Sequence, residues 1–393
     1  MVKNSVIRND VGARNPYAIA ELMNKRKIDW RKKPAADKIK ILESTFGMPY
    51  DQLFDSKYDS PLFRYLPKKN IKGIPPHVKV GSAVPDNCNR AVKLWDEKEQ
   101  SVYQAIKPTF DDPIQGCVAN CYLIAAFSSI AWATPYMFPP RTLPGPFKFK
   151  LPAPNPFNPG TDTAQGVDSK VALTDDKRIV FADSYAPNEI WPGIYEKAYA
   201  MWITKNTDNQ PDIKQTTNGN PVTALYNIMG YRDNWIKTYA TTIKQADNSL
   251  LSADDVWKGI SGLCTSAKTF RPTVAWTYGV ASTPPGDADY NNSGLVRDHA
   301  YSILGIHTED SKRYVVIRNP FGNGEPMDLS LVSGTSWRAP ELVDQGFTRT
   351  GAADPKFPPT GLSISFKNPD GVFALDVNSF RIYFEAFGWI QAQ

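Results

Sequence analysis

The longest apolar stretch of the chain is YLIAAFSSIAWA, at residues 122–133, and a cysteine comes directly before it. Apolar side chains occupy every side of the helical wheel drawn through this stretch, which predicts a helix in the centre of a core. The stretch is shorter than the ~18 residues that a membrane-spanning helix needs. We therefore expect a buried helix with Cys121 in its first turn and Asn120 as its cap.

A second helix is predicted at residues 188–203, NEIWPGIYEKAYAMWI. Pro192 is compatible with the first turn of this helix only, because proline lacks the amide hydrogen that interior positions donate. The helical face that predicts burial is formed by Ile190, Ile194, Ala198 and Trp202.

Residues 134–160 lie between the two predicted helices and contain nine prolines. Proline at this density removes backbone donors and is excluded from helix interiors. The sequence therefore predicts an extended surface loop or lid over this stretch.

After Gly230 the pattern changes to β-rich stretches, namely TVAWTYGV, AYSILGI, RYVVIRN and GVFALDVNSFRIYFEAF. The fold class that follows is α+β. We expect a helical part at residues 100–230, a β-rich part at 231–393 and an N-terminal extension at 1–99.

Two of the β-rich stretches, AYSILGI and RYVVIRN, flank the polar sequence HTEDSKR and predict an antiparallel hairpin. With the turn centred on Glu309 and Asp310, His299 is predicted to lie directly opposite Asn319. Opposed residues have Cβ atoms ~4.5–5.5 Å apart, so an asparagine there can bond one imidazole nitrogen and direct the other toward a nucleophile. His307 is predicted to lie in the solvated turn.

The composition is that of an ordinary globular protein, with 41% hydrophobic and 22% charged residues in 393. The first residues lack the apolar run of a secretory signal, so a cytoplasmic location is expected. The net charge of +5 is uneven, because residues 1–100 carry 20 Lys and Arg against 12 Asp and Glu. The basic segment at 25–40 predicts a solvated charged face; the other readings are a pro-segment acting as an intramolecular inhibitor, a membrane contact and a nuclear address.

The cysteines and histidines are few enough to restrict the chemistry. Four cysteines in a chain of this length do not form a disulfide scaffold. Cys117 and Cys121 lack a second pair of zinc ligands, because the only histidines are His77, His299 and His307.

A nucleophilic cysteine is the chemistry that the remaining pattern favours. The first turn of a helix favours thiolate over thiol, because the unpaired N–H groups and the helix dipole stabilise negative charge there. Cys121 has this place, His299 is the candidate base and Asn319 the residue that orients it. The Gln115 carboxamide and the Cys121 backbone N–H are candidate donors to an oxyanion.

These residues and their flanks resemble the protease core of the calpains, a family of cysteine proteases with a papain-like, two-lobed fold. The resemblance covers residues 100–393 and rests on five ordered motifs, which read QGCVANCYL, NEIWPGIYEKAYA, DHAYSILG, IRNPFG and DGVFALDVNSFRIYF. It implies that Cys121 is the nucleophile, His299 the base and acid, Asn319 the orienting residue and Gln115 the oxyanion donor. It also suggests substrate-binding roles for Gly116, Asp298 and Phe321.

The chain departs from the family pattern at three positions beside the reactive residues. Tyr122 replaces the usual tryptophan after the cysteine, and Phe321 replaces the tryptophan near the asparagine. Asp298 stands where the family has glycine before the histidine.

No cofactor is required by the sequence. The resemblance makes calcium a candidate regulator, and FGNGEPMD at residues 321–328 offers Glu325 and Asp328, although their spacing is shifted from that of the family's calcium loops. No EF-hand calcium loop occurs in the sequence.

The leading functional hypothesis is a calpain-like cysteine endopeptidase that cleaves protein or peptide substrates through a thioester acyl-enzyme. One alternative is a catalytically weak protein that uses the same fold for binding or as a scaffold, as the departures at Tyr122 and Asp298 suggest. A second alternative is a transglutaminase-like acyltransferase, which also needs a Cys and His pair. Neither a nucleic-acid partner nor a transmembrane segment is expected.

Overall fold

The structure is a computed structural model of the chain. It describes Ser44 and residues 91–98, 108–138, 145–151, 162–185, 189–230, 236–245, 247–265, 267–279, 283–285, 288–309, 311–323, 347–349, 362–364 and 371–392. The basic segment at 25–40, His77, Glu325 and Asp328 lie outside these residues. In the described part of the chain, no helix is both long enough and apolar enough to cross a membrane.

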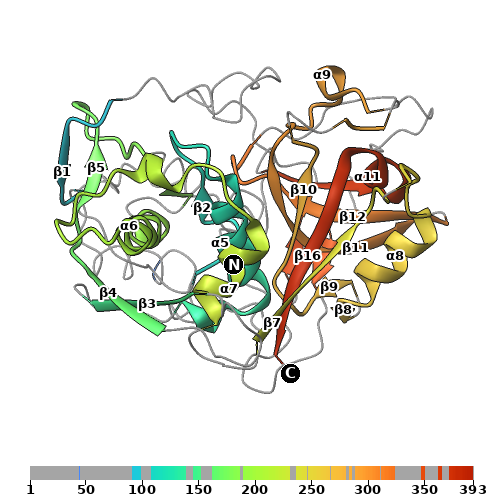
Figure 1. Cartoon of the computed structure of the whole chain (residues 1–393), viewed down its shortest axis with the longest axis horizontal. Helices are drawn as coiled ribbons and strands as arrows, with labels where there is room; N and C mark the ends of the chain where they lie inside the picture. The colour runs from blue at the N-terminus through green and yellow to red at the C-terminus, as the bar shows by residue number, and fades with distance from the viewer. Residues whose placement is uncertain are drawn as a thin grey trace.

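Three helices form one half of the molecule, which is on the left in Figure 1. They are α5 (Cys121–Ala133), α6 (Trp191–Thr204) and α7 (Pro221–Met229), accompanied by the short 3₁₀ helices η3 (Pro135–Met137) and η4 (Ile213–Thr216). Both predicted helices are confirmed, and Pro192 lies in the first turn of α6 as expected. Aromatic side chains join α5 to α6, since the Phe127 ring lies 5.8 Å from that of Tyr195.

Three two-stranded antiparallel ribbons complete this half: β1 (Leu94–Asp96) with β5 (Val171–Leu173), β2 (Pro113–Ile114) with β6 (Asp183–Ser184), and β3 (Gly145–Lys150) with β4 (Asp162–Val167). The strand β3 corrects the prediction of an extended loop or lid at 134–160. Its sequence, GPFKFK, alternates apolar and polar residues with the period of a strand, and Phe147 and Phe149 are buried. The high proline content concealed this alternation.

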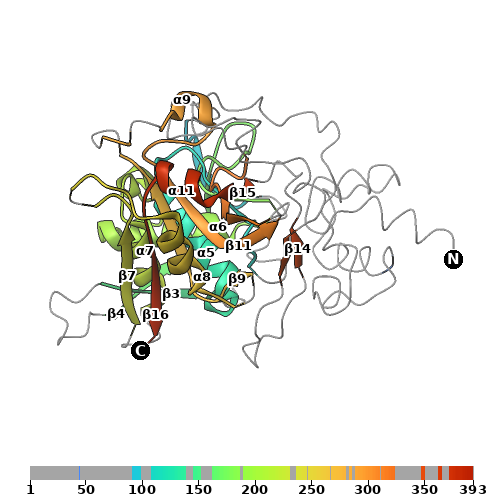
Figure 2. The same ribbon diagram turned by 90° about the vertical axis from the view of Figure 1, so that its right-hand side faces the viewer.

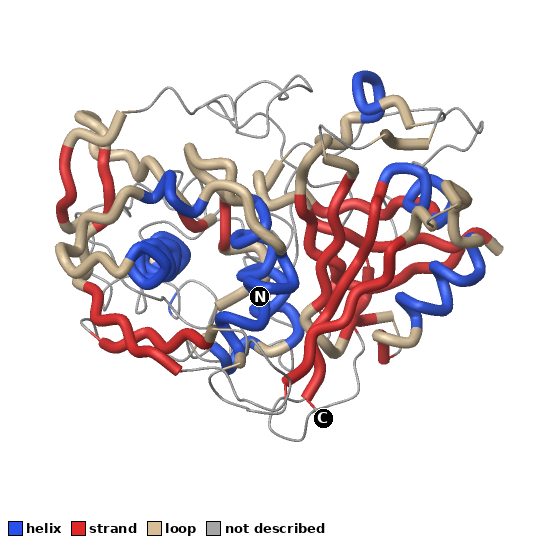
Figure 3. Tube along the Cα trace, viewed as in Figure 1, coloured by secondary structure: helices blue, strands red, loops and turns tan. Residues whose placement is uncertain are grey.

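The other half is an eight-stranded sheet with the order β15-β12-β11-β10-β16-β7, to which β9 and β8 are added beside β11. Figure 3 shows that strands dominate this half, whereas helices dominate the first. The strands are β7 (Ile236–Thr242), β8 (Cys264–Thr265), β9 (Lys268–Thr269), β10 (Thr273–Thr277), β11 (Ala300–Glu309), β12 (Lys312–Arg318), β15 (Val372–Asp376) and β16 (Phe384–Ala392). Figure 2 shows β16 and β7 side by side at one edge.

The remaining elements of this half are α8 (Ala253–Ser261), α9 (Tyr290–Ser293), α11 (Val377–Tyr383) and the pair β13 (Phe347–Arg349) and β14 (Leu362–Ile364). The predicted β-rich character is confirmed. The last predicted β-rich stretch is corrected in part, because the helix α11 separates its two strands, β15 and β16.

Both faces of the large sheet are buried, which explains the nearly continuous apolar runs in its central strands. Val274 and Ala300 belong to the core around α5, whereas their neighbours Ala275 and Tyr301 belong to the core that includes α8 and α11. Successive side chains of a strand point to opposite faces, so a single strand contributes to both cores.

Direct hydrogen bonds join α5 to the sheet. The Ser302 hydroxyl on β11 donates to the Ala125 carbonyl at 2.8 Å. The Ser129 hydroxyl on α5 donates to the Thr273 carbonyl at 2.9 Å and accepts from the amide of the same residue at 2.6 Å. These contacts hold α5 against β10 and β11.

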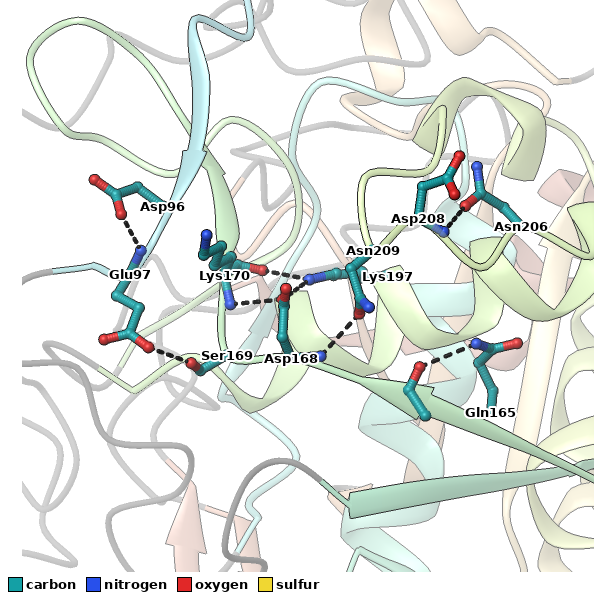
Figure 4. A network of polar contacts seen from close by, with 11 residues as sticks. Asp96, Glu97, Gln165, Asp168, Ser169, Lys170, Lys197, Asn206, Asp208 and Asn209 are labelled. Carbon is teal, nitrogen blue, oxygen red and sulfur yellow. Dashed lines mark hydrogen bonds and ion pairs between the residues drawn. The ribbon is translucent and has the colours of Figure 1, made fainter.

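A polar network on the outer side of α6 neutralises one buried cation (Figure 4). The Lys197 ammonium is almost completely buried; it pairs with Asp168 and donates to the Lys170 carbonyl at 2.9 Å. The Asn209 side chain accepts from the Asp168 amide at 2.8 Å, which joins the segment after α6 to the turn after β4. Asp168 therefore neutralises the charge of Lys197, and this pair has a structural role outside the candidate site around Cys121.

Candidate active site

Cys121 is the first residue of α5, and its sulfur lies at the start of β11. The thiol is half-buried, and the Ala300 N–H donates to its Sγ at 3.4 Å. Ala300 directly follows His299. This contact therefore brings together the segment predicted to supply the nucleophile and the segment predicted to supply the base. Residues 122–132 of the same helix are all buried, as the apolar wheel predicted.

Asn120 does not cap α5 with its side chain, so this prediction is wrong. The Asn120 amide instead donates to the Glu196 carboxylate at 2.7 Å and to the Thr216 hydroxyl at 2.9 Å. These two bonds use Nδ2 and fix the side chain in an orientation in which Oδ1, the atom that would cap α5, accepts no hydrogen bond from the described residues. The Asn120 carbonyl accepts from the Leu123 and Ile124 N–H groups, so only the N–H groups of Cys121 and Tyr122 face the reactive sulfur.

The expectation of a stabilised Cys121 thiolate is also corrected. Burial raises the pKa of this thiol to about 11, and the Asp298 carboxylate adds to the rise. The backbone N–H groups of Ala300 and Tyr122 lower the pKa, as a helix start should, but desolvation outweighs them. Desolvation therefore favours the neutral thiol over the thiolate in this structure.

His299 is 2% exposed and is held by Asn319, because its Nε2 lies 2.9 Å from the Asn319 Oδ1. The same oxygen accepts from the Phe321 N–H at 3.0 Å, so it is an acceptor and the imidazole Nε2 is the donor. Nδ1 then carries the lone pair, and no hydrogen-bond partner for it occurs among the described residues. Burial lowers the pKa of His299 to about 4, against the opposing effect of Asn319.

The pairing of His299 with Asn319 forms in a register different from the one predicted. Glu309 pairs with Lys312, so the turn is centred one residue later than expected, and a bulge follows at Leu304. Ser302 pairs with Arg318, and continuing this register places Phe321 rather than Asn319 level with His299. Asn319 reaches the imidazole from the diagonal position.

His307 does not lie in the turn, and the prediction that it would be solvated there is wrong. It belongs to β11, is paired with Tyr314 and is half-buried. The hairpin strands extend farther than the apolar residues alone indicated, because the polar residues 307–309 also pair across the hairpin, with residues 312–314.

Gln115 follows β2 and is joined to both halves of the site. Its amide N–H donates to the Pro320 carbonyl at 2.9 Å, and its side-chain Nε2 donates to the Val118 carbonyl at 2.7 Å. Gln115 therefore lies between the loop that leads to Cys121 and the residue after Asn319. At Gly116 a Cβ would come within 2.2 Å of the Phe181 carbonyl oxygen, so close packing of two backbones requires glycine there.

Asp298 directly precedes His299 in the sequence, and Phe321 lies against the His299 ring. The Phe321 ring centroid is 4.4 Å from that of His299, so the smaller aromatic still covers the imidazole. Asp298 is exposed and has φ 55°, the left-handed region that glycine adopts without strain and that aspartate tolerates. This backbone conformation explains why a glycine suits the position in the family pattern.

Tyr122 packs in the core beneath the site. A hydrogen bond joins its hydroxyl to that of Tyr199, and a Cβ at Gly219 would come within 2.4 Å of its ring. The tyrosine is thus accommodated by a polar partner and by a glycine opposite it.

Glu196 is a residue of the site's support that the sequence reasoning missed. Its side chain is 1% exposed, and it accepts from Asn120 at 2.7 Å and from the Ala182 N–H at 2.8 Å. The signal was present, because Glu196 and Lys197 interrupt an otherwise apolar helix, and a charge on such a face needs a buried partner.

Glu196 should make stability depend on pH. Burial raises its pKa from 4.5 to about 7, against the hydrogen bonds from Asn120 and Ala182. Between these pH values the folded protein keeps a proton that the unfolded chain has lost, so the free energy of unfolding falls as the pH rises. We expect Glu196→Gln to remove a fall on the order of 3 kcal/mol, measured by urea unfolding between about pH 5 and 7.

His299 acts with the opposite sign, because its lowered pKa makes stability rise between about pH 4 and 6.5. The free energy of unfolding of wild type is therefore compared with that of Glu196→Gln at each pH, and the difference between the two is the quantity of interest. Glu97→Gln, at an exposed carboxylate, is the control and should leave the slope unchanged. Parallel pH profiles for wild type and Glu196→Gln would contradict the prediction.

Metal ligands do not gather in the described part of the chain, where no group of three or more His, Cys, Asp or Glu could hold an ion. The candidate calcium segment at 321–328 is described only as far as Asn323. Calcium regulation stays a prediction, and the groups available for chemistry at this site are those of the protein.

Comparison with known proteins gives one family match and three relatives. A sequence model described as "Calpain family cysteine protease" matches residues 89–337. A thiol protease of Porphyromonas gingivalis is 26% identical over 418 aligned positions, which cover 85% of this chain and 82% of the relative. The calpain-type cysteine proteases ADL1 of Oryza sativa and DEK1 of Zea mays are 29% and 28% identical over 157 positions, 40% of this chain but only 6% of each relative.

Proposed function

The chain belongs to the calpain family of cysteine proteases, and from this premise we propose that Cys121, His299 and Asn319 form the triad of an endopeptidase. The activity is that of a cysteine-type peptidase, which acts on protein substrates. The matched region contains all three residues of the proposed triad and Gln115.

One observation carries the assignment of the triad. The Asn319 Oδ1 accepts a hydrogen bond from the His299 Nε2–H at 2.9 Å, which leaves Nδ1 as the basic nitrogen. The next residue, Ala300, donates to the Cys121 sulfur. His299, a base held in one tautomer, thus directly precedes the end of β11 that contacts the sulfur of Cys121.

The reaction starts from a neutral pair, because the pKa of Cys121 lies near 11 and that of His299 near 4. The thiol proton moves to His299 Nδ1 as Sγ attacks the peptide carbonyl carbon. The side-chain amide of Gln115 and the backbone N–H of Cys121 stabilise the oxyanion that forms. Each contributes up to ~3–4 kcal/mol. Proton transfer coupled to attack avoids an isolated thiolate in a desolvated site.

Collapse of the tetrahedral intermediate breaks the C–N bond, and His299 gives its proton to the leaving amine. A thioester to Cys121 remains. His299 Nδ1 then accepts a proton from water, the hydroxyl oxygen attacks the thioester, and the released thiolate recovers the proton as the carboxylic acid leaves. Asn319 keeps the ring in one tautomer through both half-reactions.

We infer a papain-like arrangement in which residues 100–230 and 231–393 are the two lobes. The core around α5 and the core that includes α8 and α11 support this arrangement, and strands of the large sheet contribute to both. The extension at 1–99 stays a predicted inhibitor or anchor, since most of it lies outside the described residues. A cytoplasmic location likewise stays a prediction.

Product analysis tests hydrolysis against acyl transfer. We expect a denatured protein substrate incubated in ¹⁸O-labelled water with a primary amine to give fragments whose new carboxyl ends carry the label. Mass spectrometry of the fragments makes the measurement, with protein inactivated by alkylation as the control. Conjugates of the amine without labelled carboxyl ends would support the acyltransferase, and unchanged substrate would support the binding protein.

A further inference from the structure

Arg318 is the last residue of β12 and directly precedes Asn319. Its side chain is 0% exposed and is among the largest that are fully buried. Its Nη1 donates to the Pro113 carbonyl at 2.9 Å and to the Ser128 hydroxyl at 2.7 Å, and its Nη2 donates to the Asp111 carbonyl at 2.9 Å. Every one of these acceptors is uncharged.

This arrangement is costly for stability alone. A buried guanidinium loses its hydration, and among the described residues no carboxylate lies within 4.0 Å of Arg318 to compensate for the charge. Its Nε, also buried, has no hydrogen-bond partner there. Apolar side chains would fill the same space at a lower cost, so the value of Arg318 must come from the geometry that its bonds impose.

The three acceptors belong to segments that carry the reactive groups. Pro113 lies in β2, two residues before Gln115, and Asp111 lies in the turn that leads into this strand. Ser128 is seven residues after Cys121 in α5, which places it two turns along on the same face. One planar fork therefore spans the strand before the oxyanion donor and the helix of the nucleophile.

A second hydrogen bond joins the segment around Asn319 to the segment around Gln115, in addition to those of the Arg318 guanidinium. The Gln115 amide donates to the Pro320 carbonyl at 2.9 Å, so the residues on both sides of Asn319 hold the segment around Gln115. Asn319 in turn fixes the imidazole. The distances from Gln115 and Cys121 to His299 thus depend on where the Arg318 side chain holds β2 and α5.

We propose that Arg318 is a positioning residue for peptide hydrolysis: its buried fork fixes the segments of Cys121 and Gln115 relative to Asn319 and therefore to His299. The inference rests on the proposed triad. Misplacement of reacting groups by ~1 Å can cost ~100-fold in rate without loss of substrate binding. Loss of the fork should consequently lower kcat much more than it changes KM.

The test compares two arginines of one strand. Arg318→Lys keeps the charge but cannot reach three acceptors in one plane, and we expect kcat to fall about 30- to 100-fold while KM changes less than about threefold. Arg313→Lys is the matched control, because Arg313 lies on the same strand, is partly exposed and pairs with Asp254 at 2.6 Å. It should keep kcat within about twofold.

Chemical rescue separates positioning from a general loss of stability. Arg318→Ala leaves a cavity of guanidinium shape, and low millimolar guanidinium chloride should raise its kcat at least about tenfold, whereas equal concentrations of urea or sodium chloride should not. Thermal unfolding in the same buffers reports whether the variant is folded. If Arg318→Ala does not fold, the kinetics of Arg318→Lys decide.

Two results would overturn the inference: a kcat for Arg318→Lys within about threefold of wild type, or recovery of folded Arg318→Ala that is the same with guanidinium and with urea. Failure of the proposed triad has a different signature, namely wild-type turnover by Cys121→Ala. The two failures can therefore be told apart in one set of assays.

Discussion

Peptide cleavage is expected to be lost when Cys121 is replaced by alanine, with kcat/KM lowered by at least about 10⁴-fold. The variant removes the atom that attacks the carbonyl and forms the thioester, and no neighbouring group can replace it. Cys121→Ser should be almost as inactive, because a hydroxyl in the same desolvated position is still harder to deprotonate than a thiol whose pKa is already raised to about 11. Initial rates on a quenched-fluorescence peptide measure the loss.

Cys117→Ala is the matched control for this experiment. Cys117 is also half-buried and lies four residues earlier, but it packs against a separate apolar cluster that includes Val180 and Phe181. We expect its variant to keep wild-type turnover, and peptide mapping after alkylation of wild type should show loss of activity in step with labelling of Cys121. Turnover by Cys121→Ala equal to that of wild type would exclude the proposed mechanism.

Replacement of His299 by alanine should have the second-largest effect, lowering kcat/KM by ~10²–10⁴-fold. The reason is that the thiol stays protonated unless Nδ1 accepts its proton, and nothing else in the described site is placed to do so. In wild type the same nitrogen limits activity at low pH. Its pKa of about 4 means that activity is lost as the pH falls through 4, because the imidazolium that forms cannot act as a base.

The measurement is a pH–rate profile for kcat/KM together with the rate of Cys121 alkylation. His307→Gln is the control, since His307 lies on the same strand with its backbone paired to Tyr314. It should keep both the rate and the acidic limb of the profile. An acidic limb that persists unchanged in His299→Ala would assign the titration to another group and contradict the role of His299.

Much of the site was predictable because its elements are local. The apolar residues around the helical wheel of 122–133 require burial, and Cys121 must then lie where that helix begins. The two apolar runs around HTEDSKR require a hairpin, which brings His299 and Asn319 together even with an error of register. A contact between long polar side chains tolerates a diagonal placement.

The errors share a different origin. The bulge at Leu304 lies where β9 joins β11: Gly305 pairs with Lys268, and the Thr269 hydroxyl donates to the Leu304 carbonyl. No pattern within the hairpin encodes that contact. Asn120 has the usual identity of a cap, but its Nδ2 donates to Glu196 and Thr216, which are distant in sequence. These two bonds fix the side chain in an orientation in which its Oδ1 does not accept from the first N–H groups of α5, so local propensity loses to tertiary contacts.

The amino-acid sequence alone determined the kind of chemistry, since a thiol before an apolar helix, one histidine at a strand end and one asparagine across a hairpin are set by residue type and short-range periodicity. Only the tertiary structure decided the register, the burial that shifts the pKa values of Cys121 and His299 toward their neutral forms, and the hydrogen bonds that join Arg318 to β2 and α5. The physical reason is that desolvation depends on every segment packed around a group, and those segments meet only after the chain has folded.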